Sequence, residues 1–480
     1  MGGKKFGVWM CGVAALAGCG GGGGGGGSSA PPVTVTPTPT PTPTPTSTAT
    51  CSLRSRQDWA AGVLREWYLF PETLPASLDP SPYTNVDDFI DALTATARSQ
   101  QKDRYFTYIT SIAEENAFYN SGSNAGFGIR LSTDTAAQKL FIAEAFEGAP
   151  AFAQGIDRGT EILAIGTTNA NLRTVADIIA TQGQAGIDEA IGPPDPGVTR
   201  VFRIRNGATE SVVSVTKANY TLAPVSNRYG SRIIDDGGRK VGYVNLRTFI
   251  STADPALRTA FANFRAQGIT EVIVDFRYNG GGMVSIAELM NNLLGGQRSR
   301  SDVMSHTTFR PEKASNNETE LFNPQPESIP ATRIAFIGTR GSASASELVM
   351  NTFGPYLGAA AALIGTNTFG KPVGQIAIDR ASCDDRLRVV AFRTENRDRQ
   401  GDYYTGLAGT MRATCQASDD FTKPLGDPAE ASIRTALDFL AGRSCTAISA
   451  DAIRPQALRG RELLQSRRPT AAQREVPGLF

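Results

Sequence analysis

Low-complexity sequence near the N-terminus limits where this 480-residue chain can fold. Residues 20–27 are an unbroken run of glycine, and proline and threonine alternate from Pro37 to Thr46. Glycine runs are flexible and Pro-Thr repeats favour extended polyproline II. We therefore interpret residues 20–50 as a tether that reaches on the order of 50 Å, and we expect the folded domains to begin at residue 51.

The residues before the tether have the pattern of an export signal. Two lysines precede a short apolar stretch from Phe6 to Leu16, which is too short to span a bilayer comfortably. The following residues, Leu16 to Cys19, match the bacterial lipobox, whose cysteine is diacylated. We therefore predict that residues 1–19 are a lipoprotein signal peptide, and that a lipid on Cys19 anchors the protein to a membrane of the cell envelope, facing the periplasm. The sequence leaves open whether this is the inner or the outer membrane.

Composition excludes several classes of function. Lys and Arg number 47 against 46 Asp and Glu, whereas a nucleic-acid-binding protein normally carries a basic excess. The chain has one histidine, His306, so a histidine-rich metal centre is excluded, and we expect no metal and no organic cofactor. A Ser-His-Asp triad would depend on His306 alone. Because His306 lies in a polar stretch, we interpret it as a surface residue.

Four cysteines remain after the tether: Cys51, Cys383, Cys415 and Cys445. An exported chain meets an oxidising compartment, so the sequence allows up to two disulfides. Cys383 and Cys415 flank a strand-rich stretch and are one possible pair, which would leave Cys51 for Cys445. The sequence does not choose among the three possible pairings.

The chain beyond the tether divides into four parts by its hydrophobic pattern. Residues 51–122 have apolar residues at helical spacing and predict an N-terminal helical region. Residues 123–223 change to short β-rich runs, and residues 224–447 alternate between strands and helices, as in an α/β protein. Within this third part, Asp427-Pro428-Ala429-Glu430 predicts the N-cap and first turn of a last helix. Residues 448–480 predict a polar, loosely ordered tail.

The β-rich part contains a glycine loop and a strong hairpin signal. Gly126-Phe127-Gly128-Ile129 opens this part, and Asn206-Gly207 lies between two strand patterns. The order of these features, together with Asp157 to Ile165, resembles a PDZ domain. In that family such a loop binds the C-terminal carboxylate of a peptide, which adds to the domain as an extra strand. The resemblance therefore implies that Gly126, Phe127, Gly128 and Ile129 bind peptides.

Three segments of the α/β part stand out for their chemistry, and each follows a predicted strand. They are Asp275 to Gly282, Gly341 to Glu347 and Thr368 to Gln375. In the second, small residues at a strand-to-helix turn expose a serine hydroxyl beside the free N–H groups that begin the helix. In the third, a lysine lies in an apolar, glycine-rich stretch without a nearby acidic residue. Burial can keep such a lysine neutral, and a neutral lysine can serve as a base.

These three segments resemble the motifs of the C-terminal processing (tail-specific) serine proteases, in the order that the family has them. The resemblance runs from about Gly126 to Leu440 and implies a crotonase-like (ClpP-like) spiral catalytic core with an inserted PDZ-like domain. It implies Ser344 as nucleophile, Lys371 as general base and Gln375 as the amide that orients the base. The N–H groups of Ala345 and Gly281 are the implied oxyanion donors.

The sequence departs from the family pattern at two points. Pro372 replaces the glycine that usually follows the lysine, and the separation between serine and lysine is about two residues longer than usual. The longer separation favours Ser346 as nucleophile, whereas the local Ser-Ala-Ser-Glu register favours Ser344. We prefer Ser344, because a loop between the two motifs can absorb an insertion.

The expected activity is peptide-bond hydrolysis through an acyl-enzyme, on protein or peptide substrates that present a free C-terminus. The alternative is a lipoprotein that binds peptide C-termini without cleaving them. The sequence identifies neither the natural substrate nor the oligomeric state, and it does not decide whether the PDZ-like part activates or inhibits.

Overall fold

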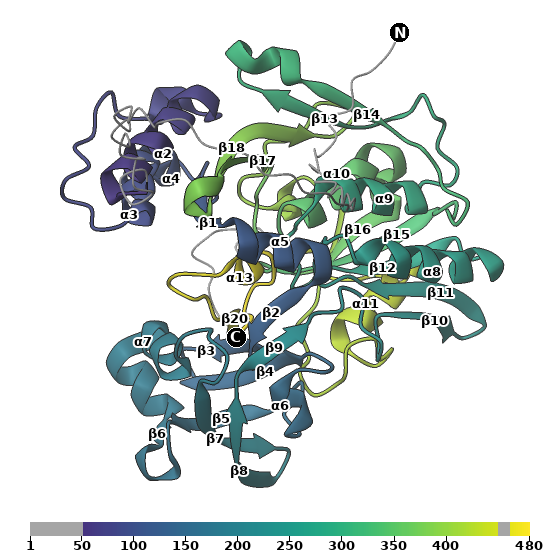
Figure 1. The fold of residues 1–480 in the computed structure, drawn as a ribbon. Helices are drawn as coiled ribbons and strands as arrows, with labels where there is room; N and C mark the ends of the chain where they lie inside the picture. Colours follow the sequence, from purple (N-terminus) through teal and green to yellow (C-terminus); the bar gives the residue numbers. More distant parts are fainter. Residues whose placement is uncertain (1–50, 450–460) are drawn as a thin grey trace, which may run out of the picture. The chain divides into compact units, whose positions relative to one another are not determined.

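The computed structural model describes residues 51–449 and 461–480 (Figure 1). The predicted signal peptide, Cys19 and the tether lie outside these residues. Among the described helices, none is both long and apolar enough to cross a membrane.

A six-stranded sheet forms the centre of the α/β part. Five neighbouring strands are parallel, and the first strand in the order pairs antiparallel with its neighbour. In sheet order they are β10 (Ser231–Asp236), β11 (Arg239–Asn245), β12 (Glu271–Asp275), β15 (Arg333–Gly338), β16 (Ala361–Gly365) and β19 (Ala413–Gln416). The predicted α/β character of residues 224–447 is confirmed.

Helices cover both faces of this sheet because its strands are apolar on both sides. Val272 and Val274 of β12 pack in one hydrophobic cluster, whereas Ile273 between them packs in another. The first cluster contains helices α8 (Ala253–Ala266), α9 (Val284–Leu294) and α10 (Ala345–Leu357), and the second contains α11 (Ala431–Leu440).

The start of helix α11 differs from the prediction. Glu430, rather than Asp427, is the N-cap residue, and its side chain accepts a hydrogen bond from the Ile433 amide. Glu430 is fully buried and also accepts from Arg277 at 3.0 Å. The buried ion pair therefore fixes the helix start three residues later than the Asp-Pro motif indicated.

A second, antiparallel sheet carries the N-terminal region. Its strands are β1 (Tyr108–Ser111), β13 (Val303–Phe309), β14 (Glu318–Leu321), β17 (Val373–Arg380) and β18 (Asp385–Glu395). Helices α2 (Leu53–Trp67), α3 (Val86–Leu93) and α4 (Ala95–Ser99) precede β1, and α5 (Ile112–Ser121) follows it. The predicted helical region is thus interrupted by one strand, whose Tyr-Ile-Thr-Ser sequence pairs with β18.

Residues 123–221 form the β-rich part and contain the predicted hairpin. A two-stranded pair joins its ends, and a seven-stranded sheet contains the rest. The pair is β2 (Ser123–Gly126) with β9 (Ala218–Thr221). The larger sheet has β3 (Ile129–Asp134), β4 (Lys139–Ala145), β5 (Glu161–Gly166), β6 (Arg173–Thr174), β7 (Thr199–Asn206), β8 (Thr209–Thr216) and β20 (Glu462–Leu463), with helices α6 (Pro150–Ala153) and α7 (Val175–Ile191).

The prediction of a loosely ordered tail is wrong for residues 461–480. Strand β20 pairs with β3, and helix α13 (Ala471–Glu475) follows. Apolar side chains spaced along this polar segment are buried, among them Leu464, Val476 and Phe480. A few buried apolar residues, dispersed among arginines, pack this segment against the rest of the protein. The average composition of the segment is polar and did not indicate them.

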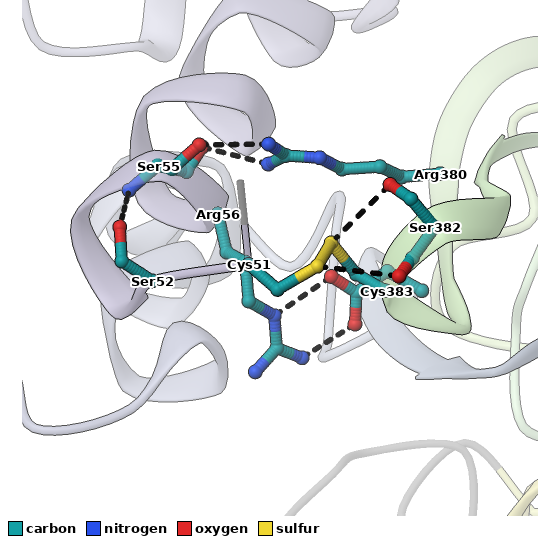
Figure 2. Close-up of a disulfide and its surroundings, with 8 residues drawn as sticks. Cys51, Ser52, Ser55, Arg56, Arg380, Ser382 and Cys383 are labelled. Atoms are coloured by element: carbon teal, nitrogen blue, oxygen red, sulfur yellow. Dashed lines mark hydrogen bonds and ion pairs between the residues drawn. A yellow bond between two sulfur atoms is a disulfide. The ribbon is translucent and has the colours of Figure 1, made fainter. Parts of the chain in front are cut away.

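The described residues contain two disulfides: Cys51 with Cys383, and Cys415 with Cys445. The pairing that joins Cys383 to Cys415 is therefore wrong. Figure 2 shows Cys51, just before helix α2, bonded to Cys383 in the connection between β17 and β18. Beside it, Arg380 donates to both Ser55 oxygens, and Arg56 forms an ion pair with Asp385.

We expect the Cys51–Cys383 disulfide to stabilise the fold strongly, because it closes a loop with a sequence separation of 332 residues. Replacing both cysteines by serine should lower the free energy of unfolding by ~2–5 kcal/mol. Denaturant unfolding of the double variant, compared with a variant of the exposed neighbour Ser382, measures this difference. An unchanged midpoint would contradict the prediction.

Candidate active site

The three predicted segments meet at one edge of the central sheet. Residues 276–282 follow β12, residues 339–344 follow β15, and residues 366–372 follow β16. These strands are parallel neighbours, so their carboxyl ends lie together. Hydrogen bonds join the segments directly: the Ala343 amide donates to the Asn279 oxygen, and the Phe369 amide donates to the Ser342 oxygen.

Ser344 occupies the sharp turn between β15 and α10. Its backbone has φ 54° and ψ −114°, a conformation that non-glycine residues rarely adopt. Such strain costs about 1–3 kcal/mol and persists only where the surroundings impose it. A strained strand-to-helix turn of this kind is the way a nucleophilic serine is raised above a parallel sheet.

The neighbouring serines are engaged elsewhere. The Ser346 hydroxyl is fully buried and donates to the Asn279 oxygen at 2.9 Å. The Ser342 hydroxyl, also fully buried, donates to the Phe276 oxygen at 2.6 Å. Ser344 alone among the three is partly exposed, so the geometry favours Ser344 over Ser346 as the nucleophile.

Lys371 is a buried lysine whose amine is held by Gln375. Its Nζ donates to Gln375 Oε1 at 2.8 Å, and Gln375 Nε2 donates in turn to the Phe106 oxygen. The amine also lies 5.1 Å from the centre of the Phe106 ring. Burial lowers the pKa of Lys371, which outweighs the attraction of Glu475 and Asp103. The site therefore favours the neutral amine, which is the form that acts as a base.

Glu347 joins the serine turn to the lysine loop, and sequence reasoning gave it no role. Its Oε2 accepts from both the Ser344 amide at 3.1 Å and the Lys371 amide at 2.7 Å, and its Oε1 accepts from the Gly370 amide. Burial raises the pKa of this carboxyl, against the hydrogen bonds that lower it. The position three residues into α10, with the serine at its N-cap, was the available signal for this contact.

The two expected oxyanion donors differ in their surroundings. Ala345 is the first residue of α10, so its amide has no acceptor within the helix. The Gly281 amide, in contrast, donates to Asn279 Oδ1 at 2.9 Å. Gly281 lies against Ser344: a Cβ on it would be 2.8 Å from Ser344 Cβ, and its φ is +124°. Only glycine allows this approach, but its N–H is not free in this structure.

The expected peptide-binding loop lies in the β-rich part, at the start of β3. Phe127 is buried in the core against Phe202, with ring centres 5.3 Å apart. The amides of Gly128 and Ile129 both donate to the main-chain oxygen of Phe480, at 2.9 and 3.2 Å. The loop is thus occupied by the chain's own residues 478–480.

His306 is not a surface residue. It is only 7% exposed on strand β13, where its ring nitrogen Nδ1 lies 2.9 Å from Thr319 Oγ1 of β14. The polar sequence around it misled the prediction, because the β13–β14 hairpin and β18 cover the ring. Its hydrogen-bond partners are Thr319 of that hairpin and the Arg397 backbone, and among the described residues no hydrogen bond joins it to Ser344.

The part of the chain that matches a known family contains the candidate site. Residues 240–402 match the family described as Peptidase family S41. The "C-terminal processing peptidase, chloroplastic" of Tetradesmus obliquus is 25% identical over 272 residues, or 54% of each chain. The "Carboxyl-terminal-processing protease" of a Picosynechococcus species is 25% identical over 255 residues, which cover 52% of this chain and 55% of the relative. The chain spans about half the length of these curated relatives.

The fold is similar to that of a solved protein from Bacteroides fragilis NCTC 9343 that is assigned to the S41 proteases. The TM-score is 0.63 at 22% identity, and the alignment covers 80% of this chain and 97% of that chain. At 22% identity, this similarity shows a shared fold.

Proposed function

Because residues 240–402 of this chain are a peptidase family S41 domain, we propose that the protein is a serine endopeptidase that hydrolyses peptide bonds in protein substrates. Ser344 is the nucleophile, Lys371 the general base, and Gln375 the amide that orients the base. The observation that carries the proposal is the shared acceptor of the two loops. The amides of Ser344 and Lys371 bind one oxygen of Glu347, which ties the strained serine to the buried lysine.

The reaction follows from these groups. Neutral Lys371 takes the proton of the Ser344 hydroxyl while the serine oxygen bonds to the carbonyl carbon of the substrate. The lysine then gives this proton to the leaving amine as the C–N bond breaks, which leaves an acyl-enzyme. Water enters, gives a proton to Lys371 and attacks the ester carbon. The proton returns to Ser344 as the acid product leaves.

The Ala345 amide and the positive end of helix α10 are suited to stabilise the oxyanion that forms in each step. Gly281 would add a second donor only after its N–H turns from Asn279 toward the substrate. Removing one donor of an oxyanion site typically costs about 10²–10³ in kcat, so a second donor at Gly281 would contribute an effect of this size.

The finer fold and the location belong to the same proposal. We assign residues 224–447 to a crotonase-like spiral core and residues 123–223 to a PDZ-like domain that selects substrates by their C-termini. Support comes from the position of Gly126 to Ile129 at the start of β3, whose outer side pairs with residues 462–463 and 478–480 of the same chain in the way that an added peptide would pair. The lipobox at Cys19 supports a lipid anchor in the cell envelope.

We expect the protein to cut one test protein faster when that protein ends in an apolar tail than when the tail is charged or amidated. The amides of Gly128 and Ile129 favour a terminal carboxylate, and the apolar surroundings of Phe127 favour an apolar last side chain. Initial rates with the three tails on an otherwise identical, unstructured substrate measure the preference. Equal rates for all tails would contradict selection by the β-rich part. Binding of tails without cleavage of any substrate, casein included, would favour the alternative of a peptide-binding lipoprotein.

A further inference from the structure

The last residues of the described chain lie along strand β3 as an added strand. The Phe480 amide donates to the Ile129 oxygen at 2.9 Å, and the Leu131 amide donates to the Gly478 oxygen at 2.8 Å. Arg130 and Leu479 form an antiparallel bridge between them. This is the geometry of a peptide that extends a sheet at its edge.

Two amides converge on one oxygen of this segment. Gly128 and Ile129 both donate to the main-chain oxygen of Phe480. In a peptide ligand, the same pair would hold an oxygen of the terminal carboxylate, for which two N–H donors are the usual partner. A Cβ on Gly126 would lie 3.0 Å from the Phe480 carbonyl carbon, so the loop fits closely around this group.

The two last side chains enter separate apolar sites. Phe480, 5% exposed, belongs to the hydrophobic cluster of the β-rich part, with Phe127, Ile129 and Ile187. Leu479 packs in another cluster, with Phe146 and Tyr220. The groove is therefore shaped for a large apolar last residue and an apolar residue before it. A cavity of about 740 Å³ lies beside the segment, and Leu479 and Phe480 are among the residues that line it.

The same segment reaches the glycine loop of the candidate active site. The Gly280 amide donates to the Glu475 oxygen at 3.0 Å, and a Cβ on Gly280 would lie 3.0 Å from Pro477 Cδ. From the other side, Arg130 of the groove strand donates to the Tyr278 oxygen at 2.5 Å. The chain that fills the groove and the strand that lines it therefore contact Gly280 and Tyr278, respectively, which precede Gly281.

We propose that residues 476–480 are an intramolecular ligand of this groove, and that the groove takes protein tails ending in an aromatic or similarly large apolar residue. The segment must leave before such a tail enters. The connection between this release and proteolysis rests on the function proposed above, but the binding of tails in the groove does not. Strand β20, paired with β3 fifteen residues earlier in the chain, keeps the segment close to the groove.

The test is the binding of a labelled peptide, Val-Pro-Gly-Leu-Phe with a free carboxylate, to protein carrying Ser344→Ala so that nothing is cut. The peptide must compete with a tethered segment whose effective concentration is on the order of 1 mM. Deleting residues 476–480 is therefore expected to tighten binding at least about tenfold relative to the undeleted protein. Gln465→Ala, at an exposed position of the same tail, is the matched control and should leave the affinity unchanged.

A second variant guards against misfolding of the deletion. A Cβ on Gly478, whose φ is +83°, would lie 2.9 Å from Arg130 Cγ, so Gly478→Val should displace the segment without altering the loop. It should also tighten peptide binding, while an amidated peptide and one ending in aspartate should bind weakly to both variants. Equal affinity in all proteins, or no preference for the terminal phenylalanine, would overturn the proposal. Tight binding by variants that cleave nothing when Ser344 is restored would leave this proposal standing and refute the proteolytic function instead.

Discussion

Ser344→Ala is expected to abolish peptide-bond hydrolysis, with a loss in kcat of about 10⁴–10⁶, the range seen when a serine nucleophile is removed. The fold should be retained, because alanine fits the same small space. Ser344→Gly should be equally inactive but slightly more stable, since glycine adopts φ 54° and ψ −114° without strain. Rates on an unstructured substrate and denaturant unfolding of the three proteins measure the two effects.

Ser346→Ala separates the two possible registers of the motif. The Ser346 hydroxyl binds the Asn279 oxygen, so its loss should reduce stability by about 1 kcal/mol and leave most of the activity. If Ser346→Ala were inactive and Ser344→Ala active, Ser346 would be the nucleophile, as the longer separation between serine and lysine favours.

Lys371→Met is expected to lower kcat by about 10²–10⁴, the usual contribution of a general base, and Lys371→Arg should be equally inactive because arginine does not give up its proton. In the unmodified protein, activity should rise with pH. The neutral amine is the active form, and burial lowers the pKa of Lys371 from its ordinary value of 10.5, which moves the rise to lower pH. A pH profile of kcat/KM that stays flat across the neutral and alkaline range would contradict this assignment.

The stability of Lys371→Met provides an independent check of the same pKa shift. Below 10.5 the lysine of the unfolded chain is charged, so folding must either bury that charge or release a proton from Lys371, and the variant avoids this cost. Lys371→Met should therefore be more stable than the unmodified protein near neutral pH. The difference should shrink as pH rises toward 10.5, where the unfolded lysine also loses its proton. His306→Ala, outside the site, should show neither the loss of activity nor this pH dependence.

The sequence predicted which segments meet at the candidate site, because each of them is a short segment that follows an apolar strand. Ser344, Lys371 and Gln375 each follow from a local pattern, and adjacent parallel strands bring such patterns to one edge. The spacing of four residues between Lys371 and Gln375 was enough to predict their hydrogen bond.

Features that depend on distant contacts could not be predicted in this way. The start of α11 is decided by the ion pair of Glu430 with Arg277, 153 residues away, and local capping signals cannot reveal it. The covering of His306 depends on the strands that pair around it. One local contact was also missed: the Gly281 amide donates to the side chain of Asn279, two residues earlier, although the glycine pattern suggested a free donor. The tail appeared polar because its buried residues are few and widely spaced.

The added strand along β3 has a consequence for how molecules of this protein meet one another. Without residues 478–480, the first part of β3 would be an open edge, with the N–H groups of Ile129 and Leu131 and the C=O of Ile129 unpaired, while β20 would still pair with Ser132 and Thr133. An apolar open edge is a template for pairing with a second chain. A molecule that has released its own segment and bound no other tail is therefore prone to dimerise, and two such molecules can exchange segments reciprocally. The same hydrogen bonds that fill the groove thus close the edge at which a second copy could pair.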